Sequence, residues 1–386
     1  MSSVAGWTLQ LPVRVHVGRG SRGALADAPD GSWLVVTSRR GRGQLLADDV
    51  LGPLVAERAA QWVDDVAPNP DAAWLEAQAV ALRSGGARVD AVLGFGGGSA
   101  IDAAKVLAAL VAVPDGVGLR DLLADAGPLS TASVPPLWAV ATTAGTGSEV
   151  TPFATVWDHA ARRKHSLASP AVWPVAAIVD ADLMDALPPD ATLATGLDAI
   201  NQAAEATWNR RANPVTLELA ARALEVGMPA LARVTEGGTD RAAREGLAEA
   251  SLLAGLAISH TRTALCHAMS YPITAHHGVA HGLACAFTMA AVARHVVPGD
   301  DGRLARLARR LWGPGAQAAD LVERFGELLT RLGVTAHVRA AVGSRAALVA
   351  LAPEMATPGR ADNALVRATR ADLERIAGEA WDGRAG

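Results

Sequence analysis

Four side chains in the second half of the sequence have the types and spacing of a metal site. Asp198 and Gln202 are four residues apart, so on one helix both side chains point to the same side. His267 and His281 follow further along the chain. A carboxylate, an amide oxygen and two imidazoles can together hold a divalent metal such as Fe²⁺ or Zn²⁺. The alternative is that each residue caps a helix or satisfies a polar group in a helical core.

A second candidate site begins with the glycine run Gly96-Gly97-Gly98, which directly follows an apolar run. Glycines allow a backbone to approach an anion closely, and a helix that starts here aims its free N–H groups at the same point. This pattern predicts a cradle for the pyrophosphate of a dinucleotide, although the spacing is not GxGxxG. An ordinary turn between strand and helix is the alternative.

Other polar residues are expected around the same nucleotide. The segment 142–149, rich in threonine and glycine, follows an apolar run and suits a nucleotide crevice at the carboxyl end of a strand, although it could be a plain loop. A basic run at 162–165 has the composition of a solvated hairpin tip. The residues predicted to contact the cofactor outside the glycine run are Asn69, Ser99, Asp102, Thr142, Thr143, Thr146 and Lys164.

Arginines rather than an acidic residue follow the second predicted strand, in the order Ser38-Arg39-Arg40-Gly41-Arg42. An acidic residue there normally accepts hydrogen bonds from the ribose 2′-hydroxyl, whereas the planar fork of arginine suits a 2′-phosphate. We therefore expect Ser38, Arg39 and Arg40 to contact the cofactor and NADPH to be preferred over NADH. The alternative is that these arginines are solvated loop charges.

Strands and helices must alternate to position these residues. Short apolar runs at 12–18, 32–37, 62–66, 90–95, 136–141 and 176–179 have the pattern of strands, with helical stretches at 44–60 and 71–85 between them. This alternation predicts a doubly wound parallel sheet. From about residue 193 long helical patterns replace the strands. We therefore expect an α/β dinucleotide-binding domain at 1–190 and an all-helical metal and substrate domain at 191–386.

Composition limits the classes of protein to consider. A chain of 386 residues, half of them apolar, is long enough for two folded domains. Its net charge of −4 gives no reason to expect nucleic acid as a partner. Two cysteines cannot form a disulfide framework, and residues 1–7 lack the pattern of a secretory leader. The apolar runs are too short to cross a membrane, so we expect a soluble, cytoplasmic protein.

Several of these motifs occur together in the order that is typical of one family. They are Gly96-Gly97-Gly98-Ser99-x-x-Asp102-x-x-Lys105, the segment 142–149, Asp180-x-x-Leu183, Gly196-Leu197-Asp198-Ala199 and His281-Gly282. From about residue 10 to 300 the chain resembles the iron-containing (group III) alcohol dehydrogenases. The resemblance implies a dehydroquinate synthase-like architecture, a metal in the cleft between the two domains, and a homodimer.

The resemblance also implies that Asp198, Gln202, His267 and His281 are the metal ligands. The chain departs from the family at Gln202, where relatives usually have histidine, and an amide oxygen is the weaker ligand. Tyr271 is a second departure, because many relatives have histidine near the nicotinamide. Tyr271, His277 and a metal-bound water are the candidate proton donors, and Lys164 is a further catalytic candidate.

Residues 266–274 and 278–285 resemble one branch of the family, the phosphonoacetaldehyde reductases. The resemblance implies reduction of phosphonoacetaldehyde to 2-hydroxyethylphosphonate, as in phosphonate antibiotic biosynthesis. A buried phosphonate needs cationic partners, so we expect Arg262 and His260 to bind it, helped by Lys164 and Asn201. A surface position for Arg262 is the alternative. A general alcohol or diol dehydrogenase, a dehydroquinate synthase-like lyase and a metal-free binding protein remain open as alternative functions.

Overall fold

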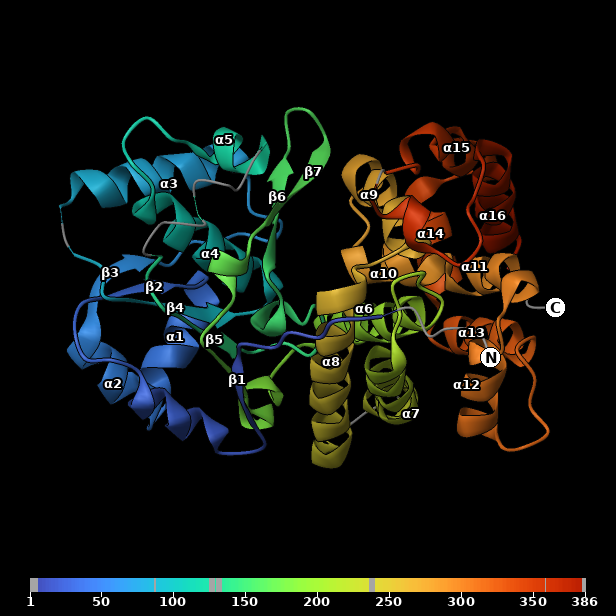
Figure 1. Ribbon diagram of the computed structural model, residues 1–386, viewed down its shortest axis with the longest axis horizontal. Helices are drawn as coiled ribbons and strands as arrows, with labels where there is room; N and C mark the ends of the chain where they lie inside the picture. Colours follow the sequence, from blue (N-terminus) through green and yellow to red (C-terminus); the bar gives the residue numbers. More distant parts are fainter. Residues whose placement is uncertain are drawn as a thin grey trace.

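The structure of the chain is a computed structural model that describes residues 6–86, 88–124, 129, 134–235, 240–357 and 359–383. An α/β half and a helical half lie side by side (Figure 1). Residues 1–5, part of the segment on which the prediction of no secretory leader rests, lie outside the described residues.

Six parallel strands form the sheet of the first half, in the order β1-β8-β5-β4-β2-β3. The strand β2 pairs with β3 on one side and with β4 on the other, so the strand order reverses between β2 and β4. Ligands of such sheets bind at the carboxyl ends of the strands where the order reverses. The predicted doubly wound parallel sheet is confirmed. Its strands are β1 Arg14–Val17, β2 Trp33–Val36, β3 Ala59–Val63, β4 Ala91–Gly96, β5 Leu137–Ala141 and β8 Ala176–Val179.

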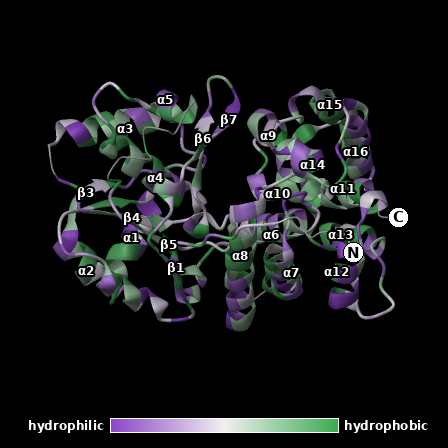
Figure 2. Cartoon of the chain, in the orientation of Figure 1, coloured by the Kyte–Doolittle hydropathy of each residue, from purple (hydrophilic) through white to green (hydrophobic). Residues whose placement is uncertain are grey.

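Helices cover both faces of this sheet because its strands are apolar on both sides (Figure 2). Leu34 and Val36 pack with α3 (Ala72–Ser84), α4 (Gly98–Ala112) and α5 (Leu119–Ala124). Trp33 and Val35 pack on the other face with α1 (Arg39–Ala47) and α2 (Leu51–Arg58). The single helix expected at 44–60 is wrong. Asp48 accepts hydrogen bonds from the backbone N–H of Val50 and Leu51, and this cap starts a second helix.

An antiparallel hairpin, β6 (Phe153–Asp158) and β7 (Arg163–Ala168), extends from the α/β half toward the helical half (Figure 1). Only part of the run 162–165 lies at its tip. Arg162 occupies the turn, with φ 52°, whereas Lys164 lies within β7, paired with Trp157. The interpretation of this run as a solvated tip is therefore wrong for Lys164. The hairpin contacts the helix α9 and thereby brings Lys164 close to the helical half.

The second half consists of packed helices. β8 ends at Val179 and α6 begins at Pro189, so the predicted boundary at 190/191 falls in the first turn of α6. The segment His281–Gly299 is long and apolar enough to span a membrane, but 78% of its most apolar window is buried inside the molecule. The helices are α6 Pro189–Thr207, α7 Pro214–Thr235, α8 Arg241–Thr261, α9 Leu265–His277, α10 His281–Phe287, α11 Met289–Val296, α12 Arg303–Trp312, α13 Asp320–Arg331, α14 Val334–Val342, α15 Arg345–Ala350 and α16 Arg370–Asp382.

Candidate active site

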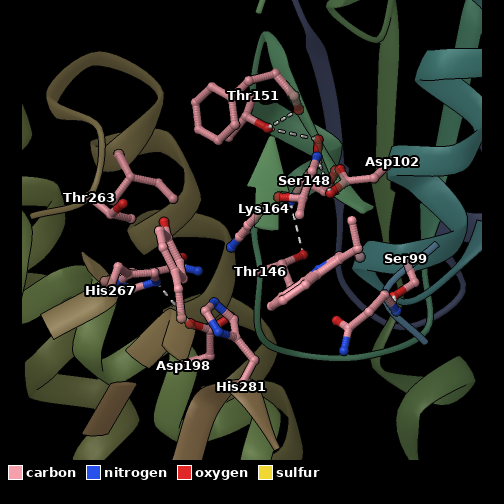
Figure 3. Close-up of a pocket in the computed structure, with 18 of the residues that line it drawn as sticks. Ser99, Asp102, Thr146, Ser148, Thr151, Lys164, Asp198, Thr263, His267 and His281 are labelled. Atoms are coloured by element: carbon pink, nitrogen blue, oxygen red, sulfur yellow. Dashed lines mark hydrogen bonds and ion pairs between the residues drawn. The ribbon is translucent and has the colours of Figure 1, made fainter. Parts of the chain in front are cut away.

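The four candidate metal ligands line one cleft between the two halves (Figure 3). Asp198 and Gln202 are one turn apart on α6, as their spacing predicts. His267 lies in the first turn of α9, and His281 is the first residue of α10. The rings of His267 and His281 are 5.3 Å apart and nearly perpendicular. Three helices thus bring two oxygen donors and two imidazoles to one place.

Glu205 fixes the orientation of His267. This buried carboxylate lies on the same helix α6, seven residues or about two turns after Asp198. Its oxygens accept hydrogen bonds from the backbone N–H of Ala264 (2.8 Å) and Cys266 (2.5 Å) at the start of α9. The Nδ1 of His267 donates to the same carboxylate at 2.7 Å. Because the proton is therefore on Nδ1, Nε2 of His267 is left free to bind a metal.

Two buried oxygens at this place lack hydrogen-bond partners, and this observation tests whether a metal fits. Asp198 Oδ1 lies 3.2 Å from His267 Nε2, but it accepts no hydrogen bond from the described residues. Gln202 Oε1 is also buried without a partner among them. Unpaired buried oxygens are costly unless something absent from the protein satisfies them. The donor set therefore fits a divalent metal.

The charges around two members of the cluster, Asp198 and His281, suit metal ligands. Burial raises the pKa of Asp198, but His267 and His281 outweigh burial and hold it below its ordinary value, so the carboxylate is ionised. Burial, and then the charge of Lys164, lower the pKa of His281 well below its ordinary value. A neutral imidazole and an ionised carboxylate are the forms that bind metals.

The glycine run forms a tight turn between β4 and α4. Gly96 has φ 148°, in the region that only glycine adopts readily. A Cβ on Gly98 would lie 2.5 Å from the side chain of Thr146, and one on Gly97 would lie 3.0 Å from Thr143 Oγ1. The threonine loop therefore packs directly on the glycine turn. Ser99, Asp102 and Thr146 line the same cleft as the metal ligands, on its α/β side (Figure 3).

Lys105 fastens the threonine loop to α4. Its fully buried ammonium lies within hydrogen-bond distance of the carbonyl oxygens of Ser148 (2.6 Å), Thr151 (2.8 Å) and Phe153 (2.9 Å). Burial lowers the pKa of Lys105 to about 8. Asp102, one turn earlier on α4, accepts hydrogen bonds from Ser148 Oγ and from the backbone N–H of Thr155. These bonds fix the segment that leads into the hairpin β6–β7.

Other predicted cofactor residues lie at the carboxyl ends of the strands. Ser38 follows β2 and caps α1 by accepting a hydrogen bond from Gly41 N–H. Arg39 is exposed in the first turn of α1, whereas Arg40 donates to the carbonyl of Ala186. Asn69, with φ 58°, lines the cleft, and its N–H donates to Ser99 Oγ.

A second, strongly basic cavity of about 450 Å³ adjoins the cleft. It shares Lys164, Tyr271 and Arg360 with the cleft and is also lined by Arg262 and Arg211. No acidic residue is among its described lining residues. Burial, and then the charges of Arg360 and Arg211, lower the pKa of Arg262 to about 10. This cavity thus gathers cations without an acidic residue among its described lining residues.

Backbone geometry turns Arg262 into this cavity. α8 ends at Thr261, and Arg262 has φ 62°, which is rare for a residue other than glycine. Its carbonyl accepts a hydrogen bond from Asn209 Nδ2 at 3.2 Å, and its guanidinium lies 4.4 Å above the ring of Phe153 in β6. Arg262 therefore reaches from the helical half to the α/β half.

Three predicted site residues, His260, Asn201 and His277, lie elsewhere. For His260 the reason is that the stretch from 259 to 267 is not one helix. The break at Arg262 turns His260 away from the metal side, and its Nε2 accepts a hydrogen bond from the N–H of Gln10. Thr263, by contrast, lines the cleft together with His267. Asn201 is fully buried and donates to the carbonyl of Cys285 at 3.4 Å. His277 ends α9 and is absent from the described lining of both cavities.

Tyr271 lies between the two cavities. Its ring stacks on that of His281 at 6.1 Å, and Lys164 Nζ lies 4.3 Å from the ring centre. Arg360 Nε donates to its hydroxyl at 3.2 Å. Burial raises the pKa of Tyr271, but Lys164 and Arg360 outweigh burial and lower it overall.

Three residues of the site were not identified from the sequence. Glu205 and Cys285 had a detectable signal, because Glu205 lies seven residues after Asp198 and Cys285 lies four residues after His281, at helical spacing. Arg360 had none. It lies in a non-helical segment and reaches the site because Asn363 Nδ2 donates to the carbonyl of Thr263.

Known proteins resemble this chain over nearly its whole length. The model of the iron-containing alcohol dehydrogenases matches residues 12–181, and that of the C-terminal part of the Fe-containing alcohol dehydrogenase family matches residues 192–375. A phosphonoacetaldehyde reductase of Streptomyces viridochromogenes is 40% identical over 310 residues, 76% of each chain. A 1-propanol dehydrogenase of Salmonella typhimurium is 31% identical over 320 residues, 81% of this chain and 80% of that one.

Solved structures share the fold. The sulfoacetaldehyde reductase of Bifidobacterium kashiwanohense, in complex with NAD⁺, is 27% identical with a TM-score of 0.85, covering 98% of this chain and 99% of that one. A 1,3-propanediol oxidoreductase is 25% identical with a TM-score of 0.85, covering 97% and 100%. The chain belongs to the iron-containing alcohol dehydrogenase family, as an NAD(P)-dependent alcohol dehydrogenase or aldehyde reductase.

Proposed function

We propose that this enzyme reduces phosphonoacetaldehyde to 2-hydroxyethylphosphonate. The observation that carries this proposal is the basic cavity beside the cleft, in which Arg262, Arg360, Arg211 and Lys164 have no acidic partner among the described lining residues. Arg262, Arg360 and Lys164 are partly buried and Arg211 is exposed. Clustered cations without an acidic neighbour favour an anionic ligand, and arginine forks match the oxygens of a phosphonate. The identity of 40% to a phosphonoacetaldehyde reductase supports the same substrate.

The cleft supplies the remaining parts of the reaction. When bound in the cleft, a dihydronicotinamide would supply the hydride and a divalent metal, Fe²⁺ or Zn²⁺, would supply Lewis acidity at the aldehyde oxygen. Asp198, Gln202, His267 and His281 would hold the metal, and Gly96–Gly98 with Thr143 and Thr146 would hold the cofactor pyrophosphate. Arg262 and Arg360 anchor the phosphonate, so that the aldehyde end extends toward His267 and His281. Tyr271, which lines both cavities, would donate the proton to the product oxygen.

Steady-state kinetics of the wild-type enzyme test the substrate. We expect kcat/KM for phosphonoacetaldehyde to exceed that for propanal, an uncharged aldehyde, by at least tenfold, because a single charge-assisted contact contributes about 1.5 to 3 kcal/mol. Sulfoacetaldehyde, a monoanion, should lie between them. Faster reduction of propanal would favour the second candidate, a general alcohol dehydrogenase, which the 31% identical 1-propanol dehydrogenase represents.

We further propose that NADPH is the preferred cofactor and NADH the second choice. Arg39 is exposed at the carboxyl end of β2, beside the point where the strand order reverses, and the adjacent residue Ser38 carries no charge that repels a 2′-phosphate. Measurement of kcat/KM with each cofactor tests this. We expect a higher value for NADPH in the wild type and a reversed preference in Arg39→Asp, and equal wild-type values would contradict the proposal.

The family resemblance supports a homodimer located in the cytoplasm as the working form of the enzyme. Sedimentation velocity of the full chain would test the dimer, and a single species at the monomer mass of 39.6 kDa would contradict it.

A further inference from the structure

A buried thiol lies beside the proposed metal ligands. Cys285 follows His281 by four residues on α10, so both side chains occupy one face of this helix. One ligand atom from each of Asp198, His267, His281 and Cys285 lies within 4.8 Å of the other three. Cys285 is fully buried and has no disulfide partner. These four atoms form a compact set of donors around one point.

Two of the separations within this set match those around a tetrahedral metal. Metal bonds of about 2.0 to 2.1 Å to nitrogen or oxygen and about 2.3 Å to sulfur place neighbouring ligand atoms roughly 3.3 to 3.6 Å apart. His267 Nε2 lies 3.2 Å from Asp198 Oδ1. Cys285 Sγ lies 3.6 Å from His281 Nε2. The side chains therefore need little movement to surround a metal.

Cys285 and Gln202 approach this point from different directions. Gln202 lines the cleft, as do Asp198, His267 and His281, whereas Cys285 is absent from the described lining of the cleft. The thiol therefore lies on the buried side of the cluster, and the amide lies on the side that faces substrate. A thiolate is also a much stronger ligand for a borderline metal than a neutral amide oxygen.

We propose that Cys285 is a metal ligand, together with Asp198, His267 and His281. The thiol loses its proton to solvent when the metal–sulfur bond forms, as happens at other thiolate sites. Gln202, also a ligand in the proposed function, would then lie on the side of the coordination shell that faces substrate. A sulfur ligand also shifts the metal preference toward Zn²⁺. The inference rests on the metal site of the proposed function.

Cobalt substitution tests the sulfur ligand without an activity measurement. The full chain, loaded with Co²⁺, should show an intense thiolate-to-cobalt charge-transfer band in the near ultraviolet. The chain has only two cysteines, Cys266 and Cys285, so Cys266→Ala must keep the band if Cys285 is the ligand. Cys285→Ser should lose the band, and Gln202→Ala should keep it. X-ray absorption of the zinc form should show one scatterer at about 2.3 Å, the length of a zinc–sulfur bond.

The assay separates failure of this inference from failure of the metal site itself. Cobalt bound without a charge-transfer band in the wild type, or a band that persists in Cys285→Ser, would contradict the sulfur ligand alone. A chain that binds neither cobalt nor zinc would contradict the metal site as well. Cys266→Ala keeps the test valid if Cys285→Ser does not fold, because the band of that variant can come only from Cys285.

Discussion

The carboxylate of Glu205 determines which nitrogen of His267 faces the metal site. It accepts a hydrogen bond from His267 Nδ1 at 2.7 Å and hydrogen bonds from two backbone N–H groups at the start of α9. A single residue on α6 thus sets both the tautomer of one ligand and the position of the helix that carries it. Such outer partners hold ligating histidines in place without touching the metal.

Replacing Glu205 with glutamine should weaken metal binding by about 10- to 100-fold, the usual effect of losing an outer carboxylate partner. Chelator competition on the purified full chain measures the affinity directly. Glu354→Gln is the matched control. Glu354 lies at the surface and accepts a hydrogen bond from His276, which like His267 is a histidine of α9. Equal metal affinities for Glu205→Gln and the control would contradict the role of Glu205.

The relative placement of Asp198 and Gln202 could be predicted from their spacing, for a physical reason. Asp198 and Gln202 lie on an uninterrupted helix, where a spacing of four residues determines the relative direction of side chains. His260 shows the limit of the same rule, because α8 ends at Thr261. The stretch 259–267 has neither glycine nor proline to signal the break. Positive φ at an arginine depends on tertiary contacts, such as the hydrogen bond from Asn209 to the Arg262 carbonyl.

At the scale of elements, Lys105 joins α4 to the loop that carries the threonines. Lys105 belongs to the glycine-rich motif that begins at Gly96. The carbonyl oxygens that bind its ammonium could not be predicted, because they lie more than forty residues later in the chain. Three carbonyl oxygens converge on one ammonium, so the loop has a single arrangement against the helix. The parallel sheet, by contrast, was predictable from short apolar runs separated by helical patterns.

Lys105→Met should lower the free energy of unfolding by about 3 to 5 kcal/mol, as expected when one member of a buried charged network is removed. The loss should also depend on pH. The pKa of Lys105 in the folded protein, about 8, lies below its ordinary value of 10.5. Between these two pH values the unfolded chain therefore binds more protons than the folded chain. As a result, Lys105 contributes more to the free energy of unfolding as pH rises. Urea unfolding of the wild type and of Lys105→Met measures the two free energies at pH 7.5 and at pH 10, roughly the two ends of this pH range. If the difference in unfolding free energy between wild type and Lys105→Met became smaller at the higher pH, the lowered pKa of Lys105 would be contradicted.

At the scale of the whole molecule, the site exists only because two halves meet. Gly147 in the threonine loop and Gly255 in α8 approach so closely that a Cβ on Gly147 would lie 2.3 Å from Gly255 Cα. The cofactor cradle belongs to the α/β half, and the metal ligands belong to the helical half. Arg262 crosses the same junction to reach Phe153. Family resemblance predicted a cleft between domains, whereas the packing of the junction depends on contacts between distant segments.

The most direct test of the account compares two substrates in Arg262→Ala. Truncating a cation that binds the phosphonate should lower kcat/KM for phosphonoacetaldehyde. Expressed as lost transition-state stabilisation, the decrease relative to wild type should be about 2 to 4 kcal/mol, while kcat/KM for propanal should hardly change. Arg324→Ala is the control, because Arg324 is an exposed arginine of α13 that pairs with Glu327. The account predicts a loss confined to the charged substrate. An equal loss on both substrates, or no loss on phosphonoacetaldehyde, would contradict it.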